Sequence, residues 1–151
     1  MKILPSRPLT ELTAHEWGAL LKVVPVILFV RLGLSTMSFK ALVERLRQWS
    51  RQLSANGSYS DEEVRRICWA VGAVGSRVLG SRPCLTQALA VQFLLWRRGI
   101  ETELRIGVDK DESGKLLAHA WVVLDDEVII GGRLSEMKYK VLPGLSDKVL
   151  R

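Results

Sequence analysis

The chain has 151 residues, nearly half of them apolar and a quarter charged, which is the composition of one globular domain with a real core. Two cysteines are too few for a disulfide scaffold, and no signal peptide is recognisable, so a reduced, cytoplasmic setting is expected. Residues 1–60 carry eight Lys and Arg against three acids, +5 of the net charge of +6, which suggests an acidic partner. Aromatic and basic side chains do not interleave and no nucleic-acid motif occurs, so nucleic acid is not expected.

The first helix is expected to begin near Thr13, because Thr13 and Glu16 have the spacing of a capping box. It is predicted to run to about Leu32 and to end at Gly33, since glycine is the residue that most often ends a helix. Pro25 is expected to kink this helix, because proline removes a backbone donor and crowds the preceding turn.

The same helix contains a strongly apolar run over residues 23–34, but Lys22 and Arg31 bracket only eight residues. A bilayer span needs about 20 apolar residues, so we interpret this run as too short to cross a membrane. The helix is expected to be buried in the core or at a protein interface. Contact with a membrane surface is the alternative.

Two further helices are predicted before residue 80. Ser38 can cap a helix to about Leu53, and Ser60 with Glu63 forms a second capping box, which opens a helix to about Val78. A loop over residues 55–58 separates them. The apolar side chains on one face are Phe39, Leu42, Val43, Leu46 and Trp49 in the first helix, and Val64, Ile67, Cys68, Val71, Val74 and Val78 in the second.

A break over residues 80–83 precedes a fourth helix, which begins at or just before Cys84 and ends at Arg98, with Gly99 as its left-handed terminal residue. The hydrophobic period then changes to alternation. Strands are predicted over residues 102–108, 116–124 and 128–130, joined by turns. Helices followed by an antiparallel meander predict an α+β fold, in which a helical layer packs on a small sheet.

Cys84 opens the fourth helix and His119 lies on the second predicted strand, and this pair carries the candidate chemistry. A helix dipole lowers the pKa of a thiol at its N-terminus, and an adjacent imidazole lowers it further and then serves as general acid. Free N–H groups there can bind an oxyanion. We therefore predict Cys84 as the nucleophile and His119 as the general base and acid of a cysteine peptidase. The alternative is that both are core residues.

Other residues have weaker claims on the site. Arg82 precedes the nucleophile and can keep a thiolate charged or grip a substrate carboxylate, or it is a solvated loop residue. Trp121 points to the same face as His119 and can shield the pair from water, or it belongs to the core. Cys68 is expected in the core and His15 on the surface. The histidines and cysteines do not form ligand pairs, so no metal is expected.

Several stretches together resemble the stand-alone, transglutaminase-like (papain-like) leader peptidases of lasso peptide biosynthesis. The stretches are Cys84-Leu85-x-x-Ala88-Leu89-Ala90, Leu94-Leu95-x-Arg97-Arg98-Gly99-Ile100, Leu104-Arg105-Ile106-Gly107-Val108 and Ala118-His119-Ala120-Trp121-Val122. The similarity covers roughly residues 60–132. It implies a single domain over residues 1–151, with a helical, basic part over residues 1–58 and a peptidase core over residues 59–151.

Such proteins cut the leader from a ribosomally made precursor peptide, and a separate cyclase then ties the core peptide into a lariat. Because helices, and not a small winged β-rich domain, precede the core here, the resemblance implies a peptidase that needs a separate leader-recognition protein. The basic N-terminal third is a candidate docking surface for that protein or for the leader. Some members are described as nucleotide-dependent, but no residues here match that role, so no cofactor is implied.

The family's third catalytic member is an Asp about twelve residues beyond the histidine, and Gly131 occupies that position here. Three interpretations remain: a Cys–His dyad, another acid such as Glu103 or Asp126 orienting His119, or a weak or inactive peptidase. Hairpin register argues against Asp125 and Asp126. A backbone carbonyl or amide can also hold the imidazole tautomer.

Other functions stay open beside the peptidase. The first is a non-catalytic module that binds or scaffolds the precursor peptide, which the glycine at position 131 keeps in view. The second is acyl transfer to an amine in place of water, for which no acceptor site is evident. A basic nucleic-acid binder is the third.

Overall fold

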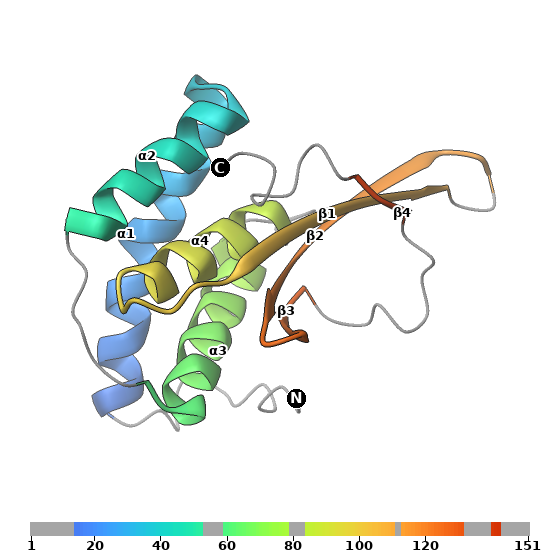
Figure 1. The fold of residues 1–151 in the computed structure, drawn as a ribbon. Helices are drawn as coiled ribbons and strands as arrows, with labels where there is room; N and C mark the ends of the chain where they lie inside the picture. Colours follow the sequence, from blue (N-terminus) through green and yellow to red (C-terminus); the bar gives the residue numbers. More distant parts are fainter. Residues whose placement is uncertain (1–13, 53–58, 79–83, 111–112, 132–139, 143–151) are drawn as a thin grey trace.

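The computed structural model describes residues 14–52, 59–78, 84–110, 113–131 and 140–142. They form helices α1 (Ala14–Thr36), α2 (Phe39–Gln52), α3 (Asp61–Val78) and α4 (Cys84–Trp96), and strands β1 (Glu103–Lys110), β2 (Leu116–Leu124), β3 (Glu127–Ile130) and β4 (Lys140–Val141). The strands make one antiparallel sheet in the order β3-β2-β1-β4. Helices gather on one side of the molecule and the β1–β2 hairpin extends beyond them (Figure 1). The predicted α+β fold is confirmed.

Local capping signals fix where α2 and α3 begin. The Ser38 hydroxyl accepts the Ala41 N–H at 3.3 Å, and the Ser60 hydroxyl accepts the Glu63 N–H at 3.3 Å. Both predicted N-caps are therefore confirmed. The Glu63 carboxylate forms an ion pair with Arg98, just past the end of α4, and so holds the start of α3 beside that end.

The prediction that Gly33 ends the first helix is wrong, because α1 continues to Thr36 and also runs through Pro25. A Cβ atom at Gly33 would lie 2.5 Å from Leu42 Cδ1, a side chain of α2 that is fully buried. The glycine therefore lets α2 approach α1 closely. In α2, Trp49 of the predicted apolar face is 39 % exposed. Its ring lies against Phe29 of α1, with centroids 4.9 Å apart.

Most residues of the first helix are apolar, and only one face of it is buried. The buried side chains on that face are Leu20, Val23, Ile27 and Val30. The prediction that the run is too short for a membrane is wrong, since the window Trp17–Thr36 is long and apolar enough by length and composition alone. Core helices of soluble proteins have the same composition but are mostly buried, whereas 28 % of this window is buried inside the protein. The burial places α1 against α3 and α4.

The fourth helix is the centre of the core. It packs against α1, α2 and α3 and against β1, β2 and β3. Every side chain over residues 88–96 is buried, so the helix has no solvent face beyond its first turn. The buried Gln92 amide donates to the Thr102 carbonyl at 3.3 Å, which links α4 to the chain entering β1. Gly99 has φ +74°, and the Ile100 N–H binds the Leu95 carbonyl at 3.0 Å, so the predicted left-handed helix end is confirmed.

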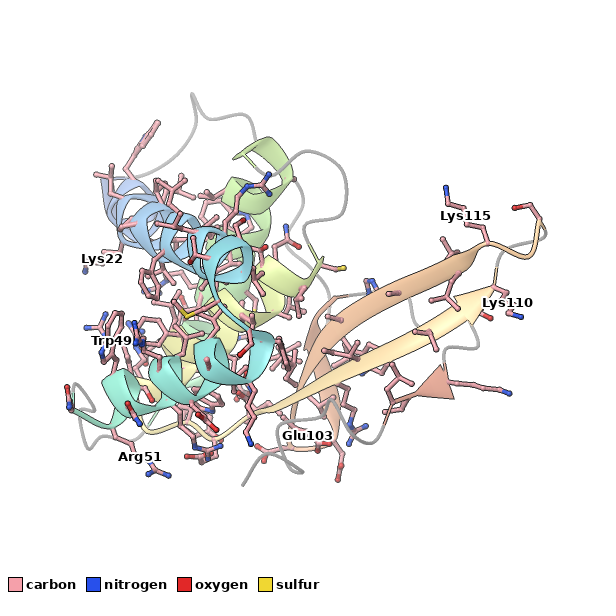
Figure 2. All side chains as sticks on the ribbon, turned by 90° about the horizontal axis from the view of Figure 1, so that it is seen from above. Lys22, Trp49, Arg51, Glu103, Lys110 and Lys115 are labelled. Carbon is pink, nitrogen blue, oxygen red and sulfur yellow. The ribbon has the colours of Figure 1, made fainter. Side chains whose placement is uncertain are left out.

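The sheet is a meander with one addition at its edge. Strands β1 and β2 pair from Glu103↔Val123 to Lys110↔Leu116, as a hairpin whose far end carries Lys110 and Lys115 away from the helices (Figure 2). Asp125 and Asp126 have φ values of +48° and +65°, which suits the predicted tight turn into β3. The two-residue strand β4 pairs with the middle of β1 and was not predicted.

Two glycines of α3 provide a matched test of how α3 packs on α4. A Cβ atom at Gly75 would lie 2.3 Å from Gln87 Nε2 and 2.7 Å from its Cγ, whereas one at Gly72 would meet no atom within 4 Å. We expect Gly75→Ala to lower the free energy of unfolding by about 1–3 kcal/mol through overpacking. Gly72→Ala should raise it by up to about 1 kcal/mol through helix propensity. Urea unfolding measures both, and equal shifts would contradict the close α3–α4 contact.

Candidate active site

Cys84 is the first residue of α4 and is half-buried where this helix meets β2. The hydrogen bond with His119 is the largest cause that holds the pKa of the thiol below its ordinary value. Partial burial acts in the opposite direction, and the N–H groups of Ala120 and Leu85 support the thiolate. The Leu85 N–H belongs to the first turn of α4, where backbone donors have no partner within the helix. The helix start thus favours a charged sulfur.

His119 lies in the middle of β2, opposite Gly107 of β1. Its Nε2 is 2.6 Å from the carbonyl oxygen of Gly131, the residue that follows β3. The hydrogen bond with Cys84 is the largest cause that raises the pKa of the imidazole, the Gly131 carbonyl adds to it, and burial opposes both. The ring is therefore held between a helix and the end of a strand.

The two pKa shifts have opposite directions and a common cause. The thiol of Cys84 becomes easier to deprotonate and the imidazole of His119 becomes easier to protonate, because each charged form is stabilised by the other. Such a pair favours the thiolate–imidazolium state, which joins a sulfur nucleophile to an acid that can protonate a leaving group. The structure thus brings together the two residues that the sequence singled out.

Trp121 covers one side of this pair. It is 5 % exposed, and its ring is stacked on that of His119, with centroids 6.1 Å apart and planes 19° from parallel. A large buried indole beside the imidazole keeps water from that side and limits how far the ring can turn. Trp121 therefore belongs to the core and also shapes the site.

Neither acid suggested for the third catalytic position orients His119. Strand register places Glu103 opposite Val123, four residues further along β2, and its carboxylate accepts two hydrogen bonds from Arg105 at 3.1 and 3.2 Å. The charge of Asp126 acts on Arg105 as well, from the turn beyond β2. The oxygen that contacts Nε2 of the ring belongs instead to the carbonyl of Gly131. Sequence patterns describe side chains, so the sequence predicts only that some backbone group can hold the imidazole, and it does not identify that group.

The second cysteine differs from the first in every respect that matters for reactivity. Cys68 lies in the middle of α3, 8 % exposed, and burial raises the pKa of its thiol to about 12. Its predicted place in the core is confirmed. Arg82 and the side chain of His15 lie outside the described residues. Within the described ranges, no three His, Cys, Asp or Glu side chains gather as metal ligands would.

Comparison with known proteins identifies one related family. The model of the transglutaminase-like superfamily matches residues 26–143, a range that runs from within α1 to the last residues of the sheet. This range covers more than half of the chain and includes both Cys84 and His119. No curated protein and no solved structure matches the chain.

The environments of the two cysteines predict a large difference in alkylation. At pH 7 we expect iodoacetamide to modify Cys84 at least about a hundredfold faster than Cys68, because a lowered pKa and partial exposure make its thiolate available. His119→Ala should slow Cys84 and leave Cys68 unchanged, because the largest cause of the lowered pKa is removed. Mass spectrometry of the two cysteine peptides over time measures both rates. Similar slow modification of both cysteines would contradict an activated thiol.

Proposed function

Because the chain belongs to the transglutaminase-like superfamily, which contains cysteine peptidases and transglutaminases, we propose that it is a cysteine peptidase acting on a precursor peptide. The substrate we propose is a ribosomally made lasso precursor, cut once to remove its leader before a separate cyclase acts. The observation that carries the proposal is the hydrogen bond between Cys84 and His119 at the start of α4. The resemblance over residues 84–122 supports the choice of substrate. A reduced cytoplasm would keep the thiol free.

The first half of the proposed reaction forms an acyl-enzyme. The thiolate of Cys84 attacks the carbonyl carbon of the scissile peptide bond, and the electron pair of the C=O bond moves onto oxygen. Backbone N–H groups at the start of α4 are positioned to stabilise this oxyanion. When the oxyanion collapses, the C–N bond breaks and the imidazolium of His119 gives its proton to the departing amine.

The second half returns the enzyme to its starting state. Neutral His119 removes a proton from water, and the resulting hydroxide attacks the thioester carbon. The C–S bond then breaks to release the Cys84 thiolate and the leader's new carboxylic acid, which loses its proton to the solvent. An amine in place of water would give acyl transfer, the other reaction found in the superfamily. The two outcomes differ in the mass of the product.

We further propose that the exposed face of α1 binds the separate leader-recognition protein that delivers the substrate. Four large apolar side chains on this face are exposed at 44, 69, 50 and 62 %, and they are Trp17, Leu21, Leu28 and Leu32. Their spacing puts them on one stripe, which Lys22 and Arg31 flank. Lys22 and Trp49 lie on the side of the helices away from the sheet (Figure 2). An apolar stripe with a basic rim fits a partner with an apolar patch and an acidic rim.

Mass spectrometry of a cognate precursor peptide tests the proposed reaction. We expect the protein and its leader-recognition partner to cut one bond, and Cys84→Ala to abolish this cleavage. Cys68→Ala, the matched control, should retain it. Cleavage that survives in Cys84→Ala would exclude the thiol mechanism. A peptide that stays bound and uncut with the unmodified protein would favour the scaffolding function, and a product joined to an amine would indicate acyl transfer.

Introducing negative charge on the apolar stripe of α1 tests the proposed docking. We expect Leu21→Glu with Leu28→Glu to lower partner-dependent cleavage about tenfold or more, because both side chains would be buried at the interface. Alkylation of Cys84 should not change. Leu116→Glu is the matched control, since Leu116 is 58 % exposed on the hairpin, far from the helices. Unchanged cleavage by the double variant would contradict the docking surface. A double variant that binds the partner normally but no longer binds anionic vesicles would contradict it as well.

A further inference from the structure

The contact between His119 and Gly131 determines which ring nitrogen carries hydrogen. The carbonyl oxygen of Gly131 lies 2.6 Å from Nε2, and a carbonyl can only accept a hydrogen bond. Nε2 must therefore carry a hydrogen and donate it. The neutral ring then has its lone pair on Nδ1, which is the nitrogen left to exchange a proton with the Cys84 thiol. One backbone oxygen thus selects the tautomer that the proposed reaction needs.

The same position excludes any side chain. Gly131 has φ +95°, a conformation that residues with a Cβ atom rarely adopt. A Cβ atom there would lie 2.6 Å from Trp121 Cβ, 2.8 Å from Trp121 Cα and 2.8 Å from the Ala120 carbonyl oxygen. These atoms belong to the backbone of β2 and to the root of a buried side chain, so they cannot move aside as the end of a flexible side chain would. Only glycine brings its carbonyl to the ring in this geometry.

We infer that Gly131 is the third member of the site, a positioning residue that orients His119 through its main-chain carbonyl. The resemblance implies a carboxylate at this position, and here the backbone of the same residue takes over its orienting role. The glycine is therefore required, and introducing Asp at position 131 damages the site in spite of matching the family pattern. This inference rests on the proposed function, since it assigns Cys84 and His119 as the reacting pair.

The test compares Cys84 alkylation by iodoacetamide between pH 5 and 9 in the full chain. We expect Gly131→Ala and Gly131→Asp each to slow Cys84 by about tenfold or more at pH 7 and to move the profile to higher pH, toward that of His119→Ala. Gly114→Ala is the matched control, because Gly114 also has a positive φ, +79°, and a Cβ atom there would meet nothing within 4 Å. It should keep the profile of the unmodified protein. Gly131 variants that fold and keep the pH profile of the unmodified protein would overturn the inference.

A second measurement decides the matter even where a Gly131 variant does not fold. In Cys84→Ser the imidazole is neutral at pH 8, and long-range ¹H–¹⁵N NMR spectra distinguish hydrogen on Nε2 from hydrogen on Nδ1. We expect the Nε2–H tautomer for His119, and the Nδ1–H tautomer would overturn the inference. If Cys84 in the unmodified protein reacts no faster than Cys68, the proposed function fails, while the tautomer still reports on Gly131. The two failures are therefore distinguishable.

Discussion

The burial of α4 on all sides beyond its first turn is the constraint on which the site depends. A helix with no solvent face cannot rotate or slide without exposing apolar surface on one side and leaving a void on another. The three other helices and three strands therefore fix its start, and with it the position of the Cys84 sulfur. Burying the Gln92 amide without a hydrogen bond would cost free energy. The amide donates to the Thr102 carbonyl, which ties the helix to the strand that follows. The packing that stabilises the core thus also sets the position of the Cys84 sulfur relative to the His119 imidazole.

The two cysteines show how environment decides what one functional group does. Cys68 is buried, and removing water from its thiolate raises the pKa to about 12. Cys84 is also partly desolvated, but the hydrogen bond with His119 outweighs that cost and the pKa falls. Half-burial has two consequences, because enough water is excluded to strengthen the attraction between thiolate and imidazolium while part of Cys84 stays exposed.

Features fixed by a few neighbouring residues were predictable from the sequence, and features fixed by distant contacts were not. The caps at Ser38 and Ser60 and the helix end at Gly99 each follow from local hydrogen bonds and backbone conformation. Gly33, like Gly99, is a glycine near an expected helix end, but its role is set by Leu42 in another helix. The local rule that glycine ends a helix therefore fails at Gly33. Pairing of β4 with β1 likewise depends on contacts across some thirty residues of chain. The cysteine–histidine pair was predictable because thiol and imidazole side chains are rare and can be located in the sequence. A backbone carbonyl occurs at every residue, so the sequence does not indicate which one accepts.

An oxygen from the backbone and one from a carboxylate differ in charge, and this difference matters for the proposed reaction. Both accept from Nε2, but a carboxylate would also hold the imidazolium by a full negative charge. With the Gly131 carbonyl in that place, the thiolate is the largest stabiliser of the protonated ring. When the thiolate attacks, its charge passes to the oxyanion, and the imidazolium loses that stabilisation just as the departing amine needs a proton. A neutral acceptor therefore keeps the ring oriented and does not stabilise the imidazolium against giving up its proton. The same neutrality makes the thiolate–imidazolium pair less strongly favoured before substrate binds.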